Sequence, residues 1–102
     1  MDNFRVIYRV LRALERGMDC EDFDPGPFAP EALGVSRERL ESLWAMLARE
    51  GYVEGVKVID TSSGRVVALS HPRITLRGLE YMQTNSMMAR AARLAKGIAE
   101  VV

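Results

Sequence analysis

The stretch VSRERLESLWAMLAREGYVEGV, residues 35–56, decides the fold because it holds a capped helix, its end and the start of a β-ribbon. Ser36 is a favourable N-cap, since its hydroxyl can accept from a free N–H of the first turn, and Val35 can pack on Leu40. Gly51 predicts a left-handed C-cap at the other end of this helix. The apolar stripe that the helix should bury consists of Leu40, Leu43, Trp44 and Leu47.

The neighbouring segments extend this helix into a predicted winged helix-turn-helix. Residues 29–34, APEALG, predict a short helix with Pro30 in its first turn, and the tight turn LGVS (33–36) leads to the longer helix. Two β-branched runs, 52–59 and 65–70, predict a hairpin. The segment DTSSG (60–64) between them predicts a loop too long for a two-residue turn. A hairpin directly after a helix-turn-helix is the layout of a wing.

Helices are also predicted at both ends of the chain. Residues 4–16 place Ile7, Val10, Leu11 and Leu14 on one face, and Gly17 ends that helix. After the hairpin, Thr75 is a predicted N-cap, and Ser86 is the predicted cap of a final helix that runs to residue 102. We therefore predict an α+β, mostly α fold, in which residues 1–85 form a winged helix-turn-helix domain and residues 86–102 form an extra C-terminal helix.

Two segments carry a resemblance to a known family. LAREGYVEGV (47–56), at the end of the third helix, and ITLRGLEYM (74–82), after the hairpin, resemble the YjcQ family of small bacterial and phage winged-helix proteins. The resemblance covers essentially the whole chain, with the acidic, proline-rich linker as an insertion, and it implies a winged helix and suggests DNA binding. The matching residues are most simply structural; they are Gly51, Tyr52, Val53, Gly55, Val56, Thr75, Gly78 and Tyr81.

Charge is balanced over the chain but not along it. The 102 residues contain 14 basic and 14 acidic side chains, so the whole molecule offers no strong attraction to nucleic acid or anionic lipid. Residues 1–51 carry seven basic and ten acidic groups, whereas residues 52–102 carry seven and four. A polyanion should therefore prefer the second half of the chain.

The helix that follows Ser36 is the candidate DNA reader. Its predicted outward face carries Glu38, Ser42, Ala45 and Arg49, with Arg37 and Arg39 near its N-terminal end. Three arginines and three glutamates make this helix neutral, and the wing adds cations for phosphate contact. The predicted DNA-contacting residues are Ser36, Arg37, Glu38, Ser42, Arg49, Lys57 and Arg65. The alternative is a protein–protein interaction or dimerisation module on a winged-helix scaffold without DNA binding.

The final predicted helix is apolar over a wider arc than one core needs, so we expect a homodimer. The predicted dimer contacts are Met88, Ala91, Leu94, Ala95, Ile98 and Val102.

Other chemistry finds little support in the sequence. Cys20 and His71 are the sole residues of their kinds, and a catalytic Cys–His pair would need the fold to bring them together with an orienting group. His71, which precedes Pro72, is predicted to end a strand. The acidic cluster between residues 19 and 24 lacks the spacing of a calcium loop. We expect no enzyme, no cofactor and no metal site.

The first helix carries a stripe of arginines opposite its apolar face, namely Arg5, Arg9, Arg12 and Arg16. Such a stripe can hold phosphates or can be a solvated face paired with nearby acids. The chain has a single cysteine, no secretory signal and no apolar run long enough to cross a bilayer, so we expect no membrane association and a cytoplasmic protein.

Overall fold

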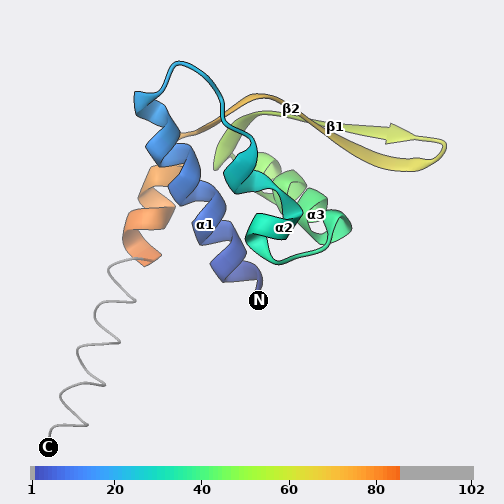
Figure 1. Ribbon diagram of the computed structural model, residues 1–102, viewed down its shortest axis with the longest axis horizontal. Coiled ribbons are helices and arrows are strands. Elements are labelled where there is room, and N and C mark those ends of the chain that lie inside the picture. The colour runs from blue at the N-terminus through green and yellow to red at the C-terminus, as the bar shows by residue number, and fades with distance from the viewer. Residues whose placement is uncertain (1, 86–102) are drawn as a thin grey trace, which may run out of the picture.

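The computed structural model describes residues 2–85, in which three helices precede a long β-ribbon and a further helix follows it. The three helices are α1 (Asn3–Arg16), α2 (Pro30–Leu33) and α3 (Arg37–Arg49). Strands β1 (Val53–Thr61) and β2 (Gly64–Ile74) pair antiparallel, and residues 76–85 are helical. This order confirms the predicted α+β, mostly helical fold class, and the arrangement is compatible with a small winged helix (Figure 1).

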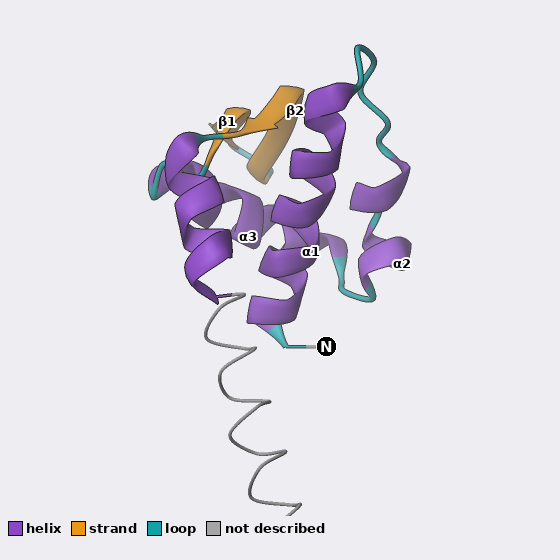
Figure 2. Ribbon diagram, turned by 90° about the vertical axis from the view of Figure 1, so that its left-hand side faces the viewer, coloured by secondary structure: helices purple, strands orange, loops and turns teal. Residues whose placement is uncertain are grey.

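Helix α1 lies at the centre of the helical layer, between α2 and the helix of residues 76–85 (Figure 1, Figure 2). The Asp2 carboxylate caps it by accepting from the Arg5 amide at 2.9 Å. Its fully buried face contains Val10, Leu11 and Leu14, as predicted, but Val6 is buried where we expected Ile7. Ile7 is only partly buried, because the buried stripe at the start of α1 is centred one residue earlier in the chain.

The linker after α1 contains two short 3₁₀ helices, η1 (Gly17–Asp19) and η2 (Gly26–Phe28). The buried Phe28 ring stacks on Phe23 with 5.3 Å between centroids and is tilted against Trp44 at 5.7 Å. These aromatic contacts attach the linker to the core.

Helices α2 and α3 form the predicted helix-turn-helix. Pro30 occupies the first turn of α2, and Gly34, with φ of 68°, ends that helix. The Ser36 hydroxyl accepts from the Arg39 amide at 3.1 Å, which confirms the predicted N-cap of α3. The buried face of α3 is as predicted and consists of Leu40, Leu43, Trp44 and Leu47.

The ribbon is longer than predicted and its turn is shorter. Thr61 pairs with Gly64, so the turn holds only Ser62 and Ser63, and our expectation of a longer loop was wrong. The Thr61 hydroxyl donates to the Gly64 carbonyl oxygen at 2.6 Å and closes the turn. This side-chain hydrogen bond helps the turn form without the Asn-Gly or Asp-Gly pair that usually marks short hairpins.

A bulge bends the ribbon where it leaves the helices. Glu54 pairs with Arg73 and Val56 pairs with Leu69, which leaves Gly55 opposite a stretch of three residues that includes His71. His71 has φ of 53°, and β2 continues past it to Ile74. The prediction that His71 ends a strand was therefore wrong, because the bulge absorbs the constraint that Pro72 imposes.

One apolar core joins these elements. Buried side chains from α1 and α3 meet Phe28, Leu33, Val53, Ile74 and Met82. Within the described residues no polar or charged side chain is buried. After the ribbon, the Thr75 hydroxyl donates to the Gly51 carbonyl oxygen at 2.6 Å and accepts from the Gly78 amide at 3.1 Å, so the last helix is fastened to the end of α3.

Candidate nucleic-acid interface

The N-terminal turn of α3 lies on the protein surface. Ser36, Arg37 and Glu38 are all exposed there. Because the Ser36 hydroxyl already accepts from the Arg39 amide, its main role is to cap the helix. The side chains in this turn that remain available to contact base edges are those of Arg37 and Arg39.

The outward face of α3 differs in part from the predicted one. Arg49 is exposed as predicted, but Ser42 and Ala45 are half-buried. Met46 is 45% exposed and stands between Ser42 and Arg49 on this face. The sequence did not indicate Met46, because an apolar residue beside a buried stripe is ordinarily assigned to the core.

The cations of the candidate interface have no acidic partner among the residues that the structure describes. Across residues 2–85 the ion pairs are Arg5 with Asp2, at 3.7 Å, and Arg12 with Glu15, at 3.1 Å. Both lie on α1, where they neutralise half of the arginine stripe. Arg37, Arg49, Lys57 and Arg65 form no ion pair within that range, so the face on which each one lies decides whether it can meet a phosphate.

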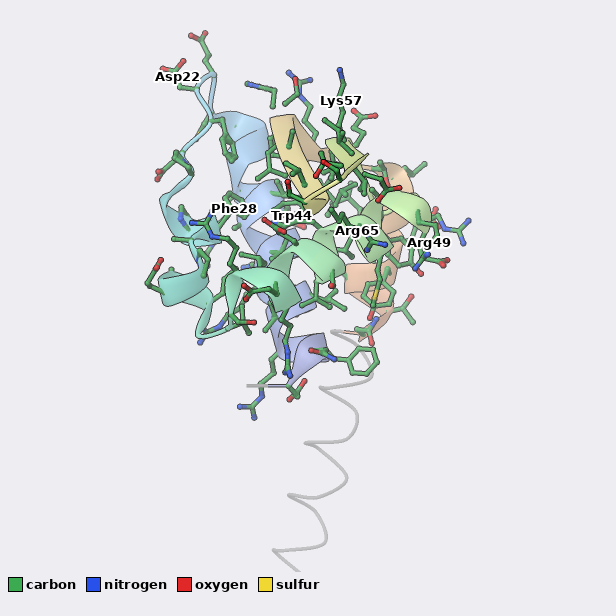
Figure 3. All side chains as sticks on the ribbon, turned by 90° about the vertical axis from the view of Figure 1, so that its right-hand side faces the viewer. Asp22, Phe28, Trp44, Arg49, Lys57 and Arg65 are labelled. Carbon is green, nitrogen blue, oxygen red and sulfur yellow. The ribbon has the colours of Figure 1, made fainter. Side chains whose placement is uncertain are left out.

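The wing does not present its two predicted cations on one side. Val56 and Val67 pack against the core, so the ribbon face that they share is directed toward the helices. The strand register places Arg65 on that face and Lys57 on the other. Viewed along the wing, Lys57 points away from α3 and Arg65 lies on the α3 side (Figure 3). Lys57 and Arg65 therefore cannot both contact a DNA duplex that lies on one face of the wing.

The wing also exposes apolar side chains. Four large apolar side chains of the ribbon are substantially exposed, namely Val58 (41%), Ile59 (47%), Val66 (47%) and Leu69 (38%). Their alternation along β1 and β2 places apolar groups on both faces of the ribbon. The sequence places such residues in a strand but does not show that the strand extends beyond the core.

An arginine–aromatic cluster lies at the C-terminal end of α3. The Arg77 guanidinium carbon lies 5.7 Å from the centre of the Tyr52 ring, which stacks on Tyr81 at 4.7 Å. Burial raises the pKa of the Tyr81 phenol above its usual 10.0, and the nearby Tyr52 adds to the rise, while Asn85 opposes it. The Tyr81 hydroxyl is thus protonated at neutral pH. Arg77 was not among the predicted contacts, because only the fold brings it over Tyr52.

These elements can be compared with known proteins. The model of the family described as YjcQ protein matches residues 8–101, which is nearly the whole chain. The chain belongs to the YjcQ family. Neither the curated proteins nor the solved structures gave a significant match.

The residues that carried the resemblance to the YjcQ family have structural roles. Gly51 follows α3 with φ of 79°, and the Gly51 and Tyr52 amides donate to the Ala48 and Leu47 carbonyl oxygens. Gly55 lies in the ribbon bulge. The family motif therefore specifies the junctions of the fold.

Two further predictions concern the remaining parts of the YjcQ chain. The predicted dimer contacts Met88, Ala91, Leu94, Ala95, Ile98 and Val102 lie outside the described residues, as does the helix predicted for 86–102. Among residues 2–85, no helix is long and apolar enough to cross a membrane.

Proposed function

We propose that this protein binds double-stranded DNA, with the N-terminal turn of α3 in the major groove and one face of the wing against phosphates. In a small bacterial or phage protein, such binding would serve transcription regulation. The observation that carries the proposal is the helix-turn-helix itself, whose α3 begins at an exposed turn with an arginine free of any described ion pair. The proposal is of a binding protein and not of an enzyme.

The three arginines have different roles in this proposal. Arg37 stands next to the α3 cap and would contact a base edge, since this motif directs the start of its second helix into the groove. Arg49 lies at the far end of α3 and would contact phosphate. Arg65, beside the wing tip, would reach the backbone or the minor groove.

A binding-site selection on random duplex DNA, at two salt concentrations, tests the proposal. Enrichment of a short sequence is the expected result, with affinity that falls as salt rises because phosphate contacts release counterions. Anisotropy titrations then separate the roles. Arg37→Ala should cost about 1 to 3 kcal/mol on the selected site alone, and Arg49→Ala and Arg65→Ala should weaken all duplexes and lower the salt slope by about one.

Lys57→Ala is the matched control, since it removes a wing cation from the face directed away from α3. We expect its binding to stay near that of the wild type. Identical isotherms for the wild type, Arg37→Ala and Arg65→Ala on selected and random duplexes would refute DNA binding.

A protein-interaction module is the second candidate function. It is favoured by the exposed apolar side chains of the wing, together with Met46 on α3. Contact through such groups would barely respond to salt, whereas DNA binding would weaken steeply. Salt dependence therefore distinguishes the two functions.

We also propose that the protein is a homodimer held by residues 86–102, on the apolar pattern of that segment. Light scattering tests this proposal. A particle mass of 11.4 kDa at micromolar concentration would identify a monomer and overturn it. Truncation after Asn85 should convert the dimer to a monomer.

A further inference from the structure

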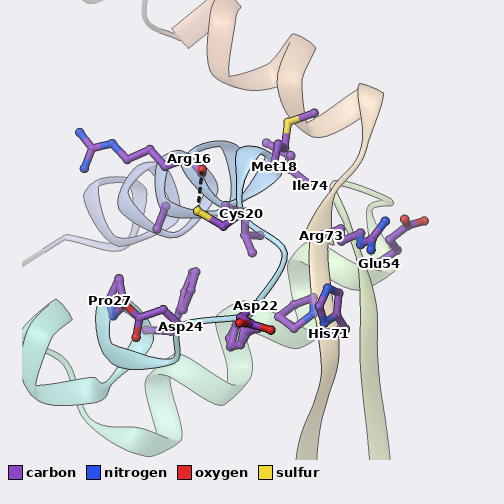
Figure 4. A pocket seen from close by; sticks show the side chains of 16 residues that line it. Arg16, Met18, Cys20, Asp22, Asp24, Pro27, Glu54, His71, Arg73 and Ile74 are labelled. Carbon is purple, nitrogen blue, oxygen red and sulfur yellow. Dashed lines mark hydrogen bonds between the residues drawn. The ribbon is translucent and has the colours of Figure 1, made fainter.

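A cavity of about 500 Å³ lies between the end of α1, the linker and the bulged base of the ribbon (Figure 4). Its volume falls within the range of small-molecule sites, roughly 300 to 1,000 Å³. The cavity is on none of the surfaces assigned above to DNA. It joins segments that are far apart in the sequence, from Ala13 to Ile74.

The inner wall of the cavity is apolar and firmly packed. Leu14, Phe28 and Ile74 line it, and all three belong to the buried core. Phe23 is only partly buried and stacks on Phe28, so part of its ring surface remains available to a ligand. A ring-sized apolar group would gain contact with this wall without any rearrangement of the core.

Charged side chains of both signs line the cavity, namely the carboxylates of Asp22, Asp24 and Glu54 and the guanidinium groups of Arg16 and Arg73. Asp24 accepts from the Gly26 amide at 3.0 Å, and Glu54 is the cross-strand neighbour of Arg73. Arg16 extends away from the cavity, whereas the Asp22 carboxylate points toward β2 (Figure 4). Asp22 has no hydrogen-bond or ion-pair partner among the described side chains and amides. With Glu54 beside Arg73 and with Arg16 directed away, Asp22 and Asp24 make the charge around this cavity negative.

The fold also brings Cys20 and His71 to this one cavity, which their separation in the sequence did not indicate. The Cys20 Sγ lies 4.0 Å from the Arg16 carbonyl oxygen, and in the described structure no hydrogen bond joins it to His71. His71 holds a positive φ in the bulge, a conformation that costs free energy for a non-glycine residue and that clusters at ligand sites.

We propose that this cavity binds a small molecule with a ring-sized apolar body and a protonated amine. The apolar body lies against Phe23, Phe28 and Ile74, and the amine faces the Asp22 carboxylate. Charge complementarity favours a cation, because three carboxylates but only two guanidinium groups line the cavity, and one of the two, Arg16, extends away from it.

Three probes of matched size test the proposal on the full chain: phenethylamine, the neutral 2-phenylethanol and the anionic phenylacetate. Trp44 is the only tryptophan and contacts Phe28, so its fluorescence reports on the cavity wall. Amide NMR shifts of residues 20–28 and 71–74 locate the site. Phenethylamine should bind saturably there, about threefold to fivefold more tightly than 2-phenylethanol, as expected for one exposed charge contact.

The Asp22→Asn variant should lose this preference for the amine and keep the binding of 2-phenylethanol. Asp19→Asn is the matched control, since Asp19 is in the same acidic segment but does not line the cavity, and it should retain the preference. The absence of saturable binding by any probe, equal or tighter binding of phenylacetate, or an unchanged preference in Asp22→Asn would each overturn the proposal. None of these measurements involves DNA, so the outcome is independent of the proposed function.

Discussion

Replacement of Gly78 by alanine tests how the helix of residues 76–85 is fastened to the rest of the fold. Gly78 is buried against the chain that leaves α3. A Cβ atom at this position would collide with the Tyr52 carbonyl oxygen and lie 2.8 Å from the Ile74 Cγ1 atom. Neither neighbour can easily move, because Tyr52 donates to the Leu47 carbonyl oxygen and Ile74 is in the core.

The size of the effect follows from the hydrogen bonds at this junction. If the helix and its Thr75 cap move outward to admit a methyl group, two bonds of Thr75 are weakened: those to the Gly51 oxygen and the Tyr52 oxygen. Their loss would cost about 2 kcal/mol at roughly 1 kcal/mol each. Alanine regains up to about 1 kcal/mol of helix propensity. We therefore expect a net loss of about 1 kcal/mol in the free energy of unfolding and a Tm lower by roughly 4 to 8 °C.

Urea unfolding followed by the fluorescence of buried Trp44 measures this loss. Gly17→Ala is the matched control, because Gly17 has φ of −68° and a Cβ atom added there would have no other atom within 4 Å. The control should be neutral or more stable by up to about 1 kcal/mol. Equal free energies of unfolding for the two variants would show that the contact with Tyr52 does not constrain position 78.

Three further predictions concern the ribbon, α3 and the tyrosine cluster. Gly55→Ala should disrupt the bulge, since φ at this position is 77° and the added Cβ atom would lie 2.7 Å from the Ser70 and His71 carbonyl oxygens. We expect faster amide exchange throughout the ribbon, and unchanged exchange would contradict this prediction. Ser36→Ala should cost about 1 kcal/mol in urea unfolding through loss of the α3 cap, whereas Ser63→Ala in the exposed turn should be neutral. The raised pKa of Tyr81 means that the folded state holds the phenolic proton more tightly than the unfolded chain does. The protonated Tyr81 therefore stabilises the fold below pH 10, and this stabilisation is lost as the pH rises through the raised pKa. Tyr81→Phe should therefore lose less stability than the wild type between neutral pH and pH 11, and an equal loss would refute the assignment.

The helical half of the fold could be predicted from sequence because its signals are local. The Ser36 cap, the apolar spacing from Leu40 to Leu47 and the stop at Gly51 act within a few residues, so the same physical causes operate in the sequence and in the folded protein. The motifs that resemble the YjcQ family include the junction glycines Gly51 and Gly55 for a related reason, since both have a positive φ that few other residues adopt. The error at Ile7 was a shift of one position along α1, which periodicity alone does not resolve.

The ribbon, the candidate DNA interface and the cavity depend on contacts between residues that are distant in the sequence. Only the tertiary structure shows these contacts. Strand register decides that Lys57 and Arg65 lie on different faces, and the bulge that sets this register involves Gly55 and His71, sixteen positions apart. The packing of the linker against the ribbon base forms the cavity and brings Asp22 to it. Local sequence thus determined which helices form and where they end, whereas long-range pairing and packing decided which side chains share a surface.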